Sequence, residues 1–309
     1  MAESNQRSDE SHESTFSILR HIIQICFVLG RSMSIILPLV CKKIEIKRYL
    51  CTENDSYCRQ MKRALRIVLK VVVAMFVLSI ALTVAYRWIN PPITLLMISR
   101  ALNGADINKK WVPLDEISPN LVRASIASED NNYLGHRGFD LGAIYDAIDE
   151  RNSGKRQRGA STISQQTAKN VFLWSGKSWI RKGLEVYFTF LIEHIWGKER
   201  IMEVYLNVIE MGNGVYGAEA AAQHYFGRSS AKLTQRQAAL IVAAYPNPRQ
   251  RDPAHPTTYL NKRASQIQRL MPLMGTIAFD EECIAEARER YDRYVDNRKA
   301  AHKRKQNKK

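Results

Sequence analysis

An unbroken apolar run constrains the fold of this chain more than any other feature of its sequence. Val71 to Tyr86 (VVVAMFVLSIALTVAY) contains no charged residue. The run extends back to Ala64 if Arg66 and Lys70 turn their charged ends toward lipid headgroups. Because about 20 apolar helical residues cross the hydrocarbon core of a bilayer, the sequence predicts a membrane anchor over residues 64–88.

The charges beside the run predict its orientation and argue against the main alternative, a buried core helix. Far fewer basic residues follow the run than precede it, and those before it are Lys62, Arg63, Arg66 and Lys70. By the positive-inside rule, the N-terminal side lies in the cytoplasm and everything after Tyr86 lies outside. Thr83 to Trp88 offers no small-x-small cleavage site, so we expect an uncleaved anchor.

Residues 1–60 form a predicted cytoplasmic extension. Its apolar stretch Ile22 to Cys41 would place Arg31 near the middle of a bilayer, which makes a second span costly without excluding it. Met61 directly precedes the basic cluster and the anchor, so we hypothesise that translation starts there and that residues 1–60 are not made. Recovery of peptides from before Met61 in the native host would contradict this hypothesis.

The cysteines and the net charge narrow the class of protein. Of the 5 cysteines only Cys283 follows the anchor, so the outer domain can form no internal disulfide, and no cysteine spacing resembles a zinc site. A net charge of +16 favours an anionic partner such as nucleic acid, phospholipid or pyrophosphate. The basic tail, residues 276–309, ends in RKAAHKRKQNKK without an aromatic residue and faces away from the cytoplasm. We therefore expect it to contact anionic lipid or to be solvated, and not to bind nucleic acid.

Beyond the anchor, the apolar pattern predicts a mainly helical domain over residues 90–275. Apolar residues recur three and four apart in Leu184–Ile195, Ile201–Ile209 and Ala238–Ala244. Strand patterns are scarce, and glycine and proline clusters mark turns, as at Gly212-Asn213-Gly214. The basic stretch Arg151–Arg158 is expected to be a loop that is either solvated or in contact with lipid phosphates.

A first candidate for chemistry is the opening stretch, Ser128 to Asp140 (SEDNNYLGHRGFD), which holds the acidic pair Glu129 and Asp130. For Asp130 and Asp140 we expect capping and turn hydrogen bonds. His136 is expected to be a packing or turn residue, because a histidine in such a turn more often fills that role than the role of a base.

A second candidate is Gly159 to Asn170 (GASTISQQTAKN), in which Ser161 or Thr162 is expected to cap a helix. Polar residues three or four apart share one face of that helix, namely Thr162, Gln165, Gln166 and Lys169. Hydroxyl and amide groups bond sugar hydroxyls, and a lysine supplies positive charge to a phosphate. The face therefore suits a sugar or phosphate site, and a merely solvated face is the alternative.

Two further stretches carry charges at helical spacing. Arg181 lies four positions before Glu185 and can approach it across one turn, which is also the pattern of an ordinary ion pair. In the stretch KERIMEVYLN, polar residues follow one face at spacing four, namely Glu199, Glu203 and Asn207. Alone, neither stretch indicates a particular reaction.

In this order and at these distances, the four stretches resemble motifs of the family 51 glycosyltransferases, which polymerise peptidoglycan from lipid II. A fifth motif is matched by His224–Gly227, Leu233-Thr234 and Ala238–Leu240. The resemblance covers roughly residues 90–270, and motifs in a fixed order are specific. The chain departs from the family at Gln237, where a glutamate is usual, and at Tyr133-Leu134 in the opening stretch.

Within the family, the chain is most similar to the monofunctional biosynthetic transglycosylases of Gram-negative bacteria. Bifunctional members append a transpeptidase with a Ser-x-x-Lys nucleophile and a later Lys-Thr-Gly. Ser229 to Lys232 matches the first pattern by chance, and the sequence contains no Lys-Thr-Gly. The resemblance implies a mainly α-helical, lysozyme-like domain of two lobes with a glycan cleft between them, behind a single N-terminal transmembrane helix.

The resemblance also implies roles for residues. Glu129 matches the general base that acts on the 4-hydroxyl of lipid II, and Glu185 matches a second carboxylate that orients the surroundings of the leaving group or a divalent metal. Lys169, Arg181 and Lys177 would stabilise the diphosphate, which leaves with inversion at the anomeric carbon. The residues expected to bind substrate are Ser161, Thr162, Gln165, Gln166, Lys169, Asn170, Lys177, Arg181, Lys182, Glu203 and Asn207. The expected cofactor is a divalent cation, Mg or Mn, with no organic cofactor.

The implied location is the bacterial inner membrane, crossed once, with the catalytic domain in the periplasm where lipid II presents its sugars. Leu141 to Ile148 is apolar enough to enter the membrane interface. Expected partners are lipid II, the nascent glycan strand, the membrane, and proteins of cell-wall synthesis or division, but no nucleic acid.

An alternative function is that of a lytic transglycosylase or muramidase, because those enzymes share the fold and also place a glutamate in a glycan cleft. Cleavage of glycan requires no cationic site for a diphosphate. Lys169 and Arg181 therefore favour synthesis.

Overall fold

The computed structural model describes residues 55–153, 159–176, 178–275 and 277–306, with the backbone alone at residues 55–59. The stretch Ile22–Cys41, the remaining extension up to residue 54, and Lys177 lie outside the described residues. The chain divides into two compact units, Met1–Ala81 and Leu82–Lys309.

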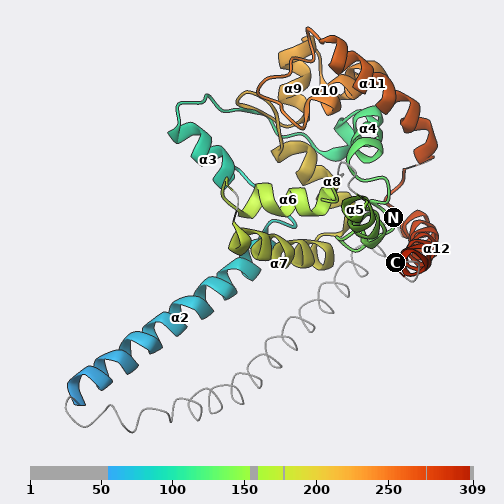
Figure 1. Cartoon of the computed structure of the whole chain (residues 1–309). Coiled ribbons are helices and arrows are strands. Elements are labelled where there is room, and N and C mark those ends of the chain that lie inside the picture. Colours follow the sequence, from blue (N-terminus) through green and yellow to red (C-terminus); the bar gives the residue numbers. More distant parts are fainter. Residues whose placement is uncertain (1–54, 154–158, 177, 276, 307–309) are drawn as a thin grey trace, which may run out of the picture. The chain divides into compact units, whose positions relative to one another are not determined.

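Helices dominate the described residues, which confirms the predicted fold class (Figure 1). The α-helices are α2 (Asp55–Ala85), α3 (Leu95–Leu102), α4 (Pro119–Glu129), α5 (Leu141–Asn152), α6 (Ile163–Phe172), α7 (Trp179–Ile195), α8 (Gly197–Val208), α9 (Ala218–Phe226), α10 (Gln235–Ala244), α11 (Thr258–Leu270) and α12 (Glu281–Gln306). The other elements are the strands β1 (Asn108–Lys109), β2 (Glu210–Gly212) and β3 (Val215–Tyr216) and the short 3-10 helices η2 (Leu114–Glu116), η3 (Ser230–Lys232) and η4 (Met271–Met274).

Helix α2 contains the predicted anchor. Its segment Gln60–Ala85 is, among the described residues, the one helix long and apolar enough to cross a membrane. Little of this segment is buried, and large apolar side chains such as Val72, Phe76 and Leu78 are exposed. A core helix would bury these side chains, so their exposure favours a membrane anchor over the alternative of a buried helix.

The last turn of α2 belongs to the second unit and is held by the corner between α7 and α8. Trp196, which lies between these helices, donates from Nε1 to the carbonyl of Thr83 at 2.7 Å. Arg87 donates from Nη1 to the carbonyl of Ile195 at 2.6 Å. The end of the apolar helix is therefore tied to α7, which carries Glu185.

The helices of the second unit pack in two groups around one continuous core (Figure 1). In one group α4, α10 and α11 pack against one another, and in the other α6 packs against α7 and α8. Both groups contribute fully buried core residues, among them Leu121, Ile163, Ile201 and Ile241. This arrangement is consistent with the lysozyme-like fold that the resemblance implies.

Most α-helices of the second unit begin at a residue whose short polar side chain accepts a hydrogen bond from the backbone of the first turn. These N-caps are Thr94, Ser118, Asp140, Thr162, Ser178, Thr234 and Thr257. A capped helix start depends on neighbouring residues only, which is why the sequence could predict the cap of α6 at Ser161 or Thr162.

The first departure from the family pattern has a structural explanation in the cap of α10. The backbone N–H of Gln237 donates to Thr234 Oγ1, and the Gln237 side chain reaches back to accept from the Thr234 N–H at 3.1 Å. A glutamine closes this reciprocal capping box as well as a glutamate does.

The second departure lies at Tyr133, whose side chain is fully buried. Its hydroxyl donates to the carbonyl of Lys198 at 2.6 Å, and the Lys198 ammonium lies 4.7 Å from the centre of the ring. Tyr133 therefore packs the opening stretch against the start of α8.

A small sheet of order β1-β3-β2 lies beside the helices. Strand β3 pairs in parallel with β1 and antiparallel with β2. The predicted turn Gly212-Asn213-Gly214 joins β2 and β3. Gly214 has a φ of 73°, and a Cβ there would lie 2.1 Å from the carbonyl oxygen of Asp106, so the turn requires glycine.

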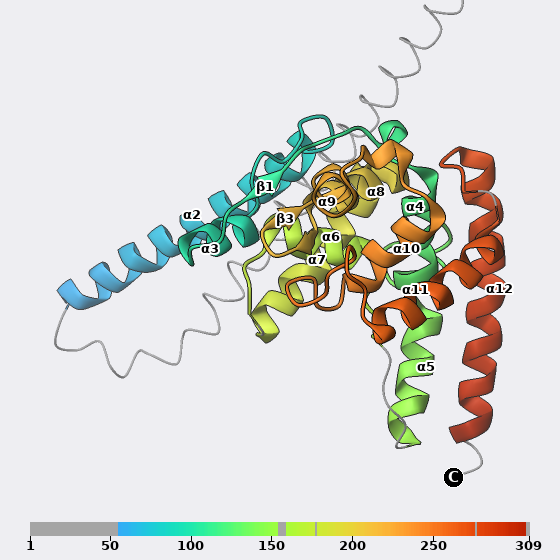
Figure 2. The same ribbon diagram turned by 90° about the horizontal axis from the view of Figure 1, so that it is seen from above.

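The C-terminal residues agree only in part with the predicted lipid-bound or solvated tail. Helix α12 packs along α5 (Figure 2). His302 Nδ1 lies 2.6 Å from Asp149 Oδ1, and Arg298 Nη1 lies 3.3 Å from Asp146 Oδ1. Most residues of the stretch 298–306 remain exposed, as the solvated alternative predicted, but composition alone did not predict these acidic partners, because they lie far away in the sequence.

Candidate active site

Glu129 is the last residue of α4 and is held from two sides. Gln166 on α6 donates from Nε2 to Glu129 Oε2 at 3.1 Å, and Ser128 donates from Oγ to Glu129 Oε1 at 3.2 Å. Glu129 is partly exposed. Its carboxylate therefore has a fixed orientation and still has access to solvent or substrate, as a general base requires.

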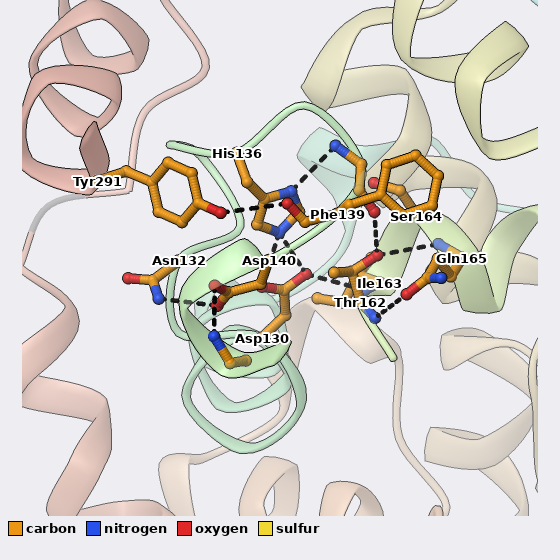
Figure 3. Close-up of polar contacts among 12 residues, drawn as sticks. Asp130, Asn132, His136, Phe139, Asp140, Thr162, Ile163, Ser164, Gln165 and Tyr291 are labelled. Carbon is orange, nitrogen blue, oxygen red and sulfur yellow. Dashed lines mark hydrogen bonds and ion pairs between the residues drawn. The ribbon is translucent and has the colours of Figure 1, made fainter. Parts of the chain in front are cut away.

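The start of α6 is bound directly to the opening stretch (Figure 3). Thr162 caps the helix and donates from Oγ1 to the carbonyl of Gly138 at 2.7 Å. The backbone N–H of Ile163 donates to Asp130 Oδ2 at 2.9 Å. These bonds fix α6, and hence Gln166, relative to the end of α4.

His136 and Asp130, the residue after Glu129, form a buried pair (Figure 3). His136 Nε2 lies 2.9 Å from both oxygens of Asp130, and the Gly138 N–H donates to His136 Nδ1 at 3.1 Å. Because Nδ1 accepts, the proton of the neutral ring is on Nε2 and is donated to Asp130. His136 is therefore a packing and turn residue, as predicted, and both nitrogens are occupied.

Glu185 lies on α7 and is 4% exposed. Arg181 Nη1 lies 3.5 Å from Glu185 Oε2, which confirms the predicted ion pair across one turn, and Lys182 Nζ bonds to Glu185 Oε1. The carboxylate thus holds two cations in place.

The pKa of Lys169 on α6 is affected by both Glu129 and Glu185. Burial lowers the pKa of Lys169, as do the nearby charges of Arg181 and Lys182, while the carboxylates of Glu185 and Glu129 oppose this shift. Influence from both carboxylates places Lys169 within electrostatic reach of Glu129 and Glu185. The site therefore combines a carboxylate held for proton transfer with a cluster of three cations.

Several residues of the site carried no signal in the sequence. The Tyr205 hydroxyl donates to Gln166 Oε1 at 3.4 Å, and Arg263 donates from Nη2 to Ser128 Oγ at 3.1 Å. Burial raises the pKa of Tyr205, and Glu129 adds to that shift. Tyr205 was indistinguishable from a core aromatic residue, and Arg263 lies on α11, which carries none of the motifs that indicated chemistry.

Other predicted substrate-binding residues have different surroundings. Gln165 completes the capping box of α6 with Thr162. Ser161 is exposed just before that helix, and Asn170 is buried within it. None of these three contacts Glu129 or Glu185 in a hydrogen bond between described residues.

Glu203 and Asn207 on α8 are occupied with structural contacts. Glu203 Oε1 lies 2.6 Å from Arg200 Nη1. Asn207 exchanges two hydrogen bonds with the backbone of Val112, accepting from its N–H at 3.0 Å and donating to its carbonyl at 2.9 Å. Contact of substrate with the Asn207 amide would require breaking these bonds.

The described residues offer no ready-made cluster of protein ligands for a divalent metal. They contain no group of three or more His, Cys, Asp or Glu side chains placed to hold an ion. Glu185 is already bonded by Arg181 and Lys182, and these two charges repel a further cation. Mg or Mn therefore stays a prediction.

A pocket of about 330 Å³ opens between the opening stretch and α12. It is lined by Gly135, Arg137, Phe139, Leu141, Arg288, Tyr291 and Asp292. These residues include neither Glu129 nor Glu185. The pocket is therefore not the candidate active site, which is defined by the hydrogen bonds and charges around these two carboxylates.

Comparison with known proteins matches residues 97–272 to the family model described as Transglycosylase. Relatives named biosynthetic peptidoglycan transglycosylase come from several bacteria. That of Caulobacter vibrioides is 51% identical over 213 residues, which are 68% of this chain and 92% of the relative. That of Shewanella oneidensis is 47% identical over 223 residues, 71% of this chain and 96% of the relative. That of Bacteroides thetaiotaomicron is 50% identical over 220 residues, 69% of this chain and 89% of the relative.

Proposed function

The chain belongs to the transglycosylase family and is a peptidoglycan glycosyltransferase, and we propose that Glu129 is the general base of its sugar transfer. The observation that carries this proposal is the hydrogen bond from Gln166 to Glu129. Lys169 lies three positions after Gln166 on the same helix and therefore near the same face. Together they supply an oriented carboxylate and a positive charge, which is the combination that transfer from a lipid diphosphate needs.

The substrates are lipid II and the growing glycan strand. In the proposed reaction the 4-hydroxyl oxygen of lipid II attacks the anomeric carbon of the strand, and its proton passes to Glu129. The bond from that carbon to the diphosphate oxygen breaks, and undecaprenyl diphosphate leaves. Attack and departure on opposite faces of the sugar give inversion.

The leaving diphosphate gathers negative charge, which Lys169, Arg181 and Lys182 are proposed to stabilise. Glu185 bonds Arg181 and Lys182, so these cations are ordered before substrate arrives. We assign Glu185 this ordering role and no proton transfer. We propose that a divalent cation, if one is used, enters the site bound to the diphosphate oxygens of the substrate. Loss of activity in the presence of a chelator would support this role, and unchanged activity would contradict it.

The enzyme is membrane-associated, and a single span with a periplasmic catalytic domain is proposed. Support comes from the apolar helix Gln60–Ala85 and from the basic residues before it. Leu141, Ile144 and Ile148 are exposed on α5 and support contact of this helix with the membrane interface. Alkaline phosphatase fused after Lys309 should be active, and an inactive fusion at normal expression would contradict this orientation. Proteins of cell-wall synthesis or division remain proposed partners, which cross-linking in cells would test.

Incubation of the purified protein with labelled lipid II in detergent tests the function directly. Long glycan that moenomycin suppresses is the expected product, moenomycin being the inhibitor that the family resemblance implies. Incubation with purified sacculi is the matching test for the alternative. Shortened glycan from sacculi without polymer from lipid II would indicate a lytic enzyme instead.

A further inference from the structure

Helix α12 lies beyond the residues that match the family model, which end at 272, and it contacts the stretch that carries Glu129. In Figure 2 it runs alongside α5, the helix that follows the opening stretch. The inference below rests on the proposed role of Glu129 and asks what this additional helix contributes to it.

Tyr291 is the one buried residue of α12. Its hydroxyl accepts from the backbone N–H of Leu141 at 2.7 Å. It also donates to the carbonyl of Phe139 at 3.2 Å (Figure 3). Leu141 is the first residue of α5, and its N–H has no partner within the helix. The Tyr291 hydroxyl therefore completes the start of α5 and fixes the two residues on either side of Asp140.

The same tyrosine packs on the buried pair of His136 and Asp130. The rings of Tyr291 and His136 meet edge to face with centroids 5.9 Å apart. His136 donates to Asp130, and Asp130 accepts the N–H of Ile163 at the start of α6. A continuous chain of contacts thus runs from α12 to the junction between α4 and α6.

Two glycines show how closely α12 approaches this part of the fold. A Cβ at Gly135 would lie 2.5 Å from Tyr291 Cβ and 2.7 Å from the carbonyl oxygen of Ala287. A Cβ at Gly142 would lie 2.1 Å from the Tyr294 ring. Neither glycine has a positive φ, so both are required by the close approach of α12 and not by backbone conformation.

We propose that Tyr291 is a positioning residue for catalysis, which acts through His136 and Asp130 to hold Glu129 against Gln166. It touches neither substrate nor reacting atoms. Its effect is to restrict movement of the opening stretch, so that the carboxylate of Glu129 keeps the orientation that proton transfer needs. A displacement of about 1 Å at such a site can cost up to about 100-fold in rate.

A purely structural role for α12 is the competing explanation, and a matched pair of variants on the same helix separates the two. Tyr291→Phe removes both hydrogen bonds and keeps the ring. Tyr294→Phe removes a hydrogen bond to Asp146 of 3.4 Å and keeps a ring that packs on α5 equally closely. Full-length wild type, both variants and Glu129→Gln are assayed on lipid II, below the unfolding temperature of each.

Tyr291→Phe is expected to lower kcat about 10-fold with KM for lipid II within about two-fold of wild type. Tyr294→Phe is expected to keep kcat within about two-fold of wild type. Equal kcat for wild type and Tyr291→Phe would overturn the inference, as would a kcat loss shared equally by Tyr294→Phe. If wild type itself makes no polymer, or Glu129→Gln remains active, the proposed function fails and not this inference alone.

Discussion

Gln166 donates a hydrogen bond of 3.1 Å to Glu129 across 37 positions of the sequence. The bond joins the C-terminal end of α4 to the second turn of α6, and these helices belong to different packing groups. Orientation of the proposed base therefore depends on the docking of one group against the other.

Replacement of Glu129 by glutamine should nearly abolish polymerisation while binding of lipid II survives. The change keeps the size of the side chain and removes its ability to take a proton, which typically contributes about 10²–10⁴-fold. Turnover and binding of labelled lipid II are measured separately. Glu116→Gln, at an exposed carboxylate in η2, is the control and should behave as wild type. Near-normal turnover by Glu129→Gln would refute the assignment.

Replacement of Gln166 by methionine should lower kcat about 10-fold or more, because a hydrogen bond to a charged group contributes about 1.5–3 kcal/mol. Methionine has a similar length and lacks the amide that donates to Glu129. The matched control is Gln223→Met, which removes a bond of the same kind, from Gln223 Nε2 to Glu219 Oε1 at 3.2 Å, on α9. A kcat loss of equal size in both variants would point to lost stability and not to orientation of Glu129.

In a plot of activity against pH, the fall at high pH (the alkaline limb) should be caused by deprotonation of Lys169. Burial lowers the pKa of Lys169, so its charge is lost at a lower pH than that of an ordinary lysine, and activity should fall as pH rises through that value. Lys169→Arg stays charged and should move the limb to higher pH. Lys232→Arg, at an exposed lysine, is the control. An alkaline limb that is the same in Lys169→Arg and wild type would exclude Lys169 as its origin.

Replacement of Glu185 by glutamine should affect both rate and pH dependence. The variant leaves Arg181 and Lys182 without the carboxylate that orders them, and loss of one electrostatic stabiliser typically costs about 10²–10³-fold. Glu185 also raises the pKa of Lys169, so its removal should move the alkaline limb to lower pH than in wild type. A pH–rate profile of the residual activity checks this, and a shift in the opposite direction would contradict the proposed charge cluster.

The packing of α12 predicts opposite effects of two glycine-to-alanine changes on stability. Gly135→Ala forces a Cβ against the backbone of Ala287 and should destabilise the protein by about 1–3 kcal/mol. Gly183 lies in α7, and a Cβ there would meet no other atom. Gly183→Ala should therefore stabilise the protein by about 0.5–1 kcal/mol. Thermal unfolding of the full chain in detergent measures both. No destabilisation by Gly135→Ala would show that α12 does not hold this close position in solution.

Features that depend on neighbouring residues were predictable from the sequence. Spacing of four positions predicted the ion pair between Arg181 and Glu185. A short polar residue before the helix predicted a cap at Ser161 or Thr162, and the structure shows that it is Thr162. Both depend on backbone geometry within one helical turn. The apolar run of α2 was likewise readable, because crossing a bilayer requires only length and composition.

Contacts between segments that lie far apart in the sequence could not be predicted from such local patterns. No local signal in the sequence placed Tyr205 and Arg263 in the site, and none predicted that α12 packs along α5. Asp149, for example, pairs with His302 and Lys305, which the sequence had assigned to lipid contact or solvation.

The sequence by itself thus determined the helical stretches Leu184–Ile195, Ile201–Ile209 and Ala238–Ala244, the start of α6, the apolar anchor segment and the types of side chain available for chemistry. Only the tertiary structure decided that Gln166 meets Glu129 and that Tyr291 lies behind His136. The physical reason is that hydrogen bonds within a turn form wherever the local backbone is helical, whereas contacts between helices depend on how the whole core packs.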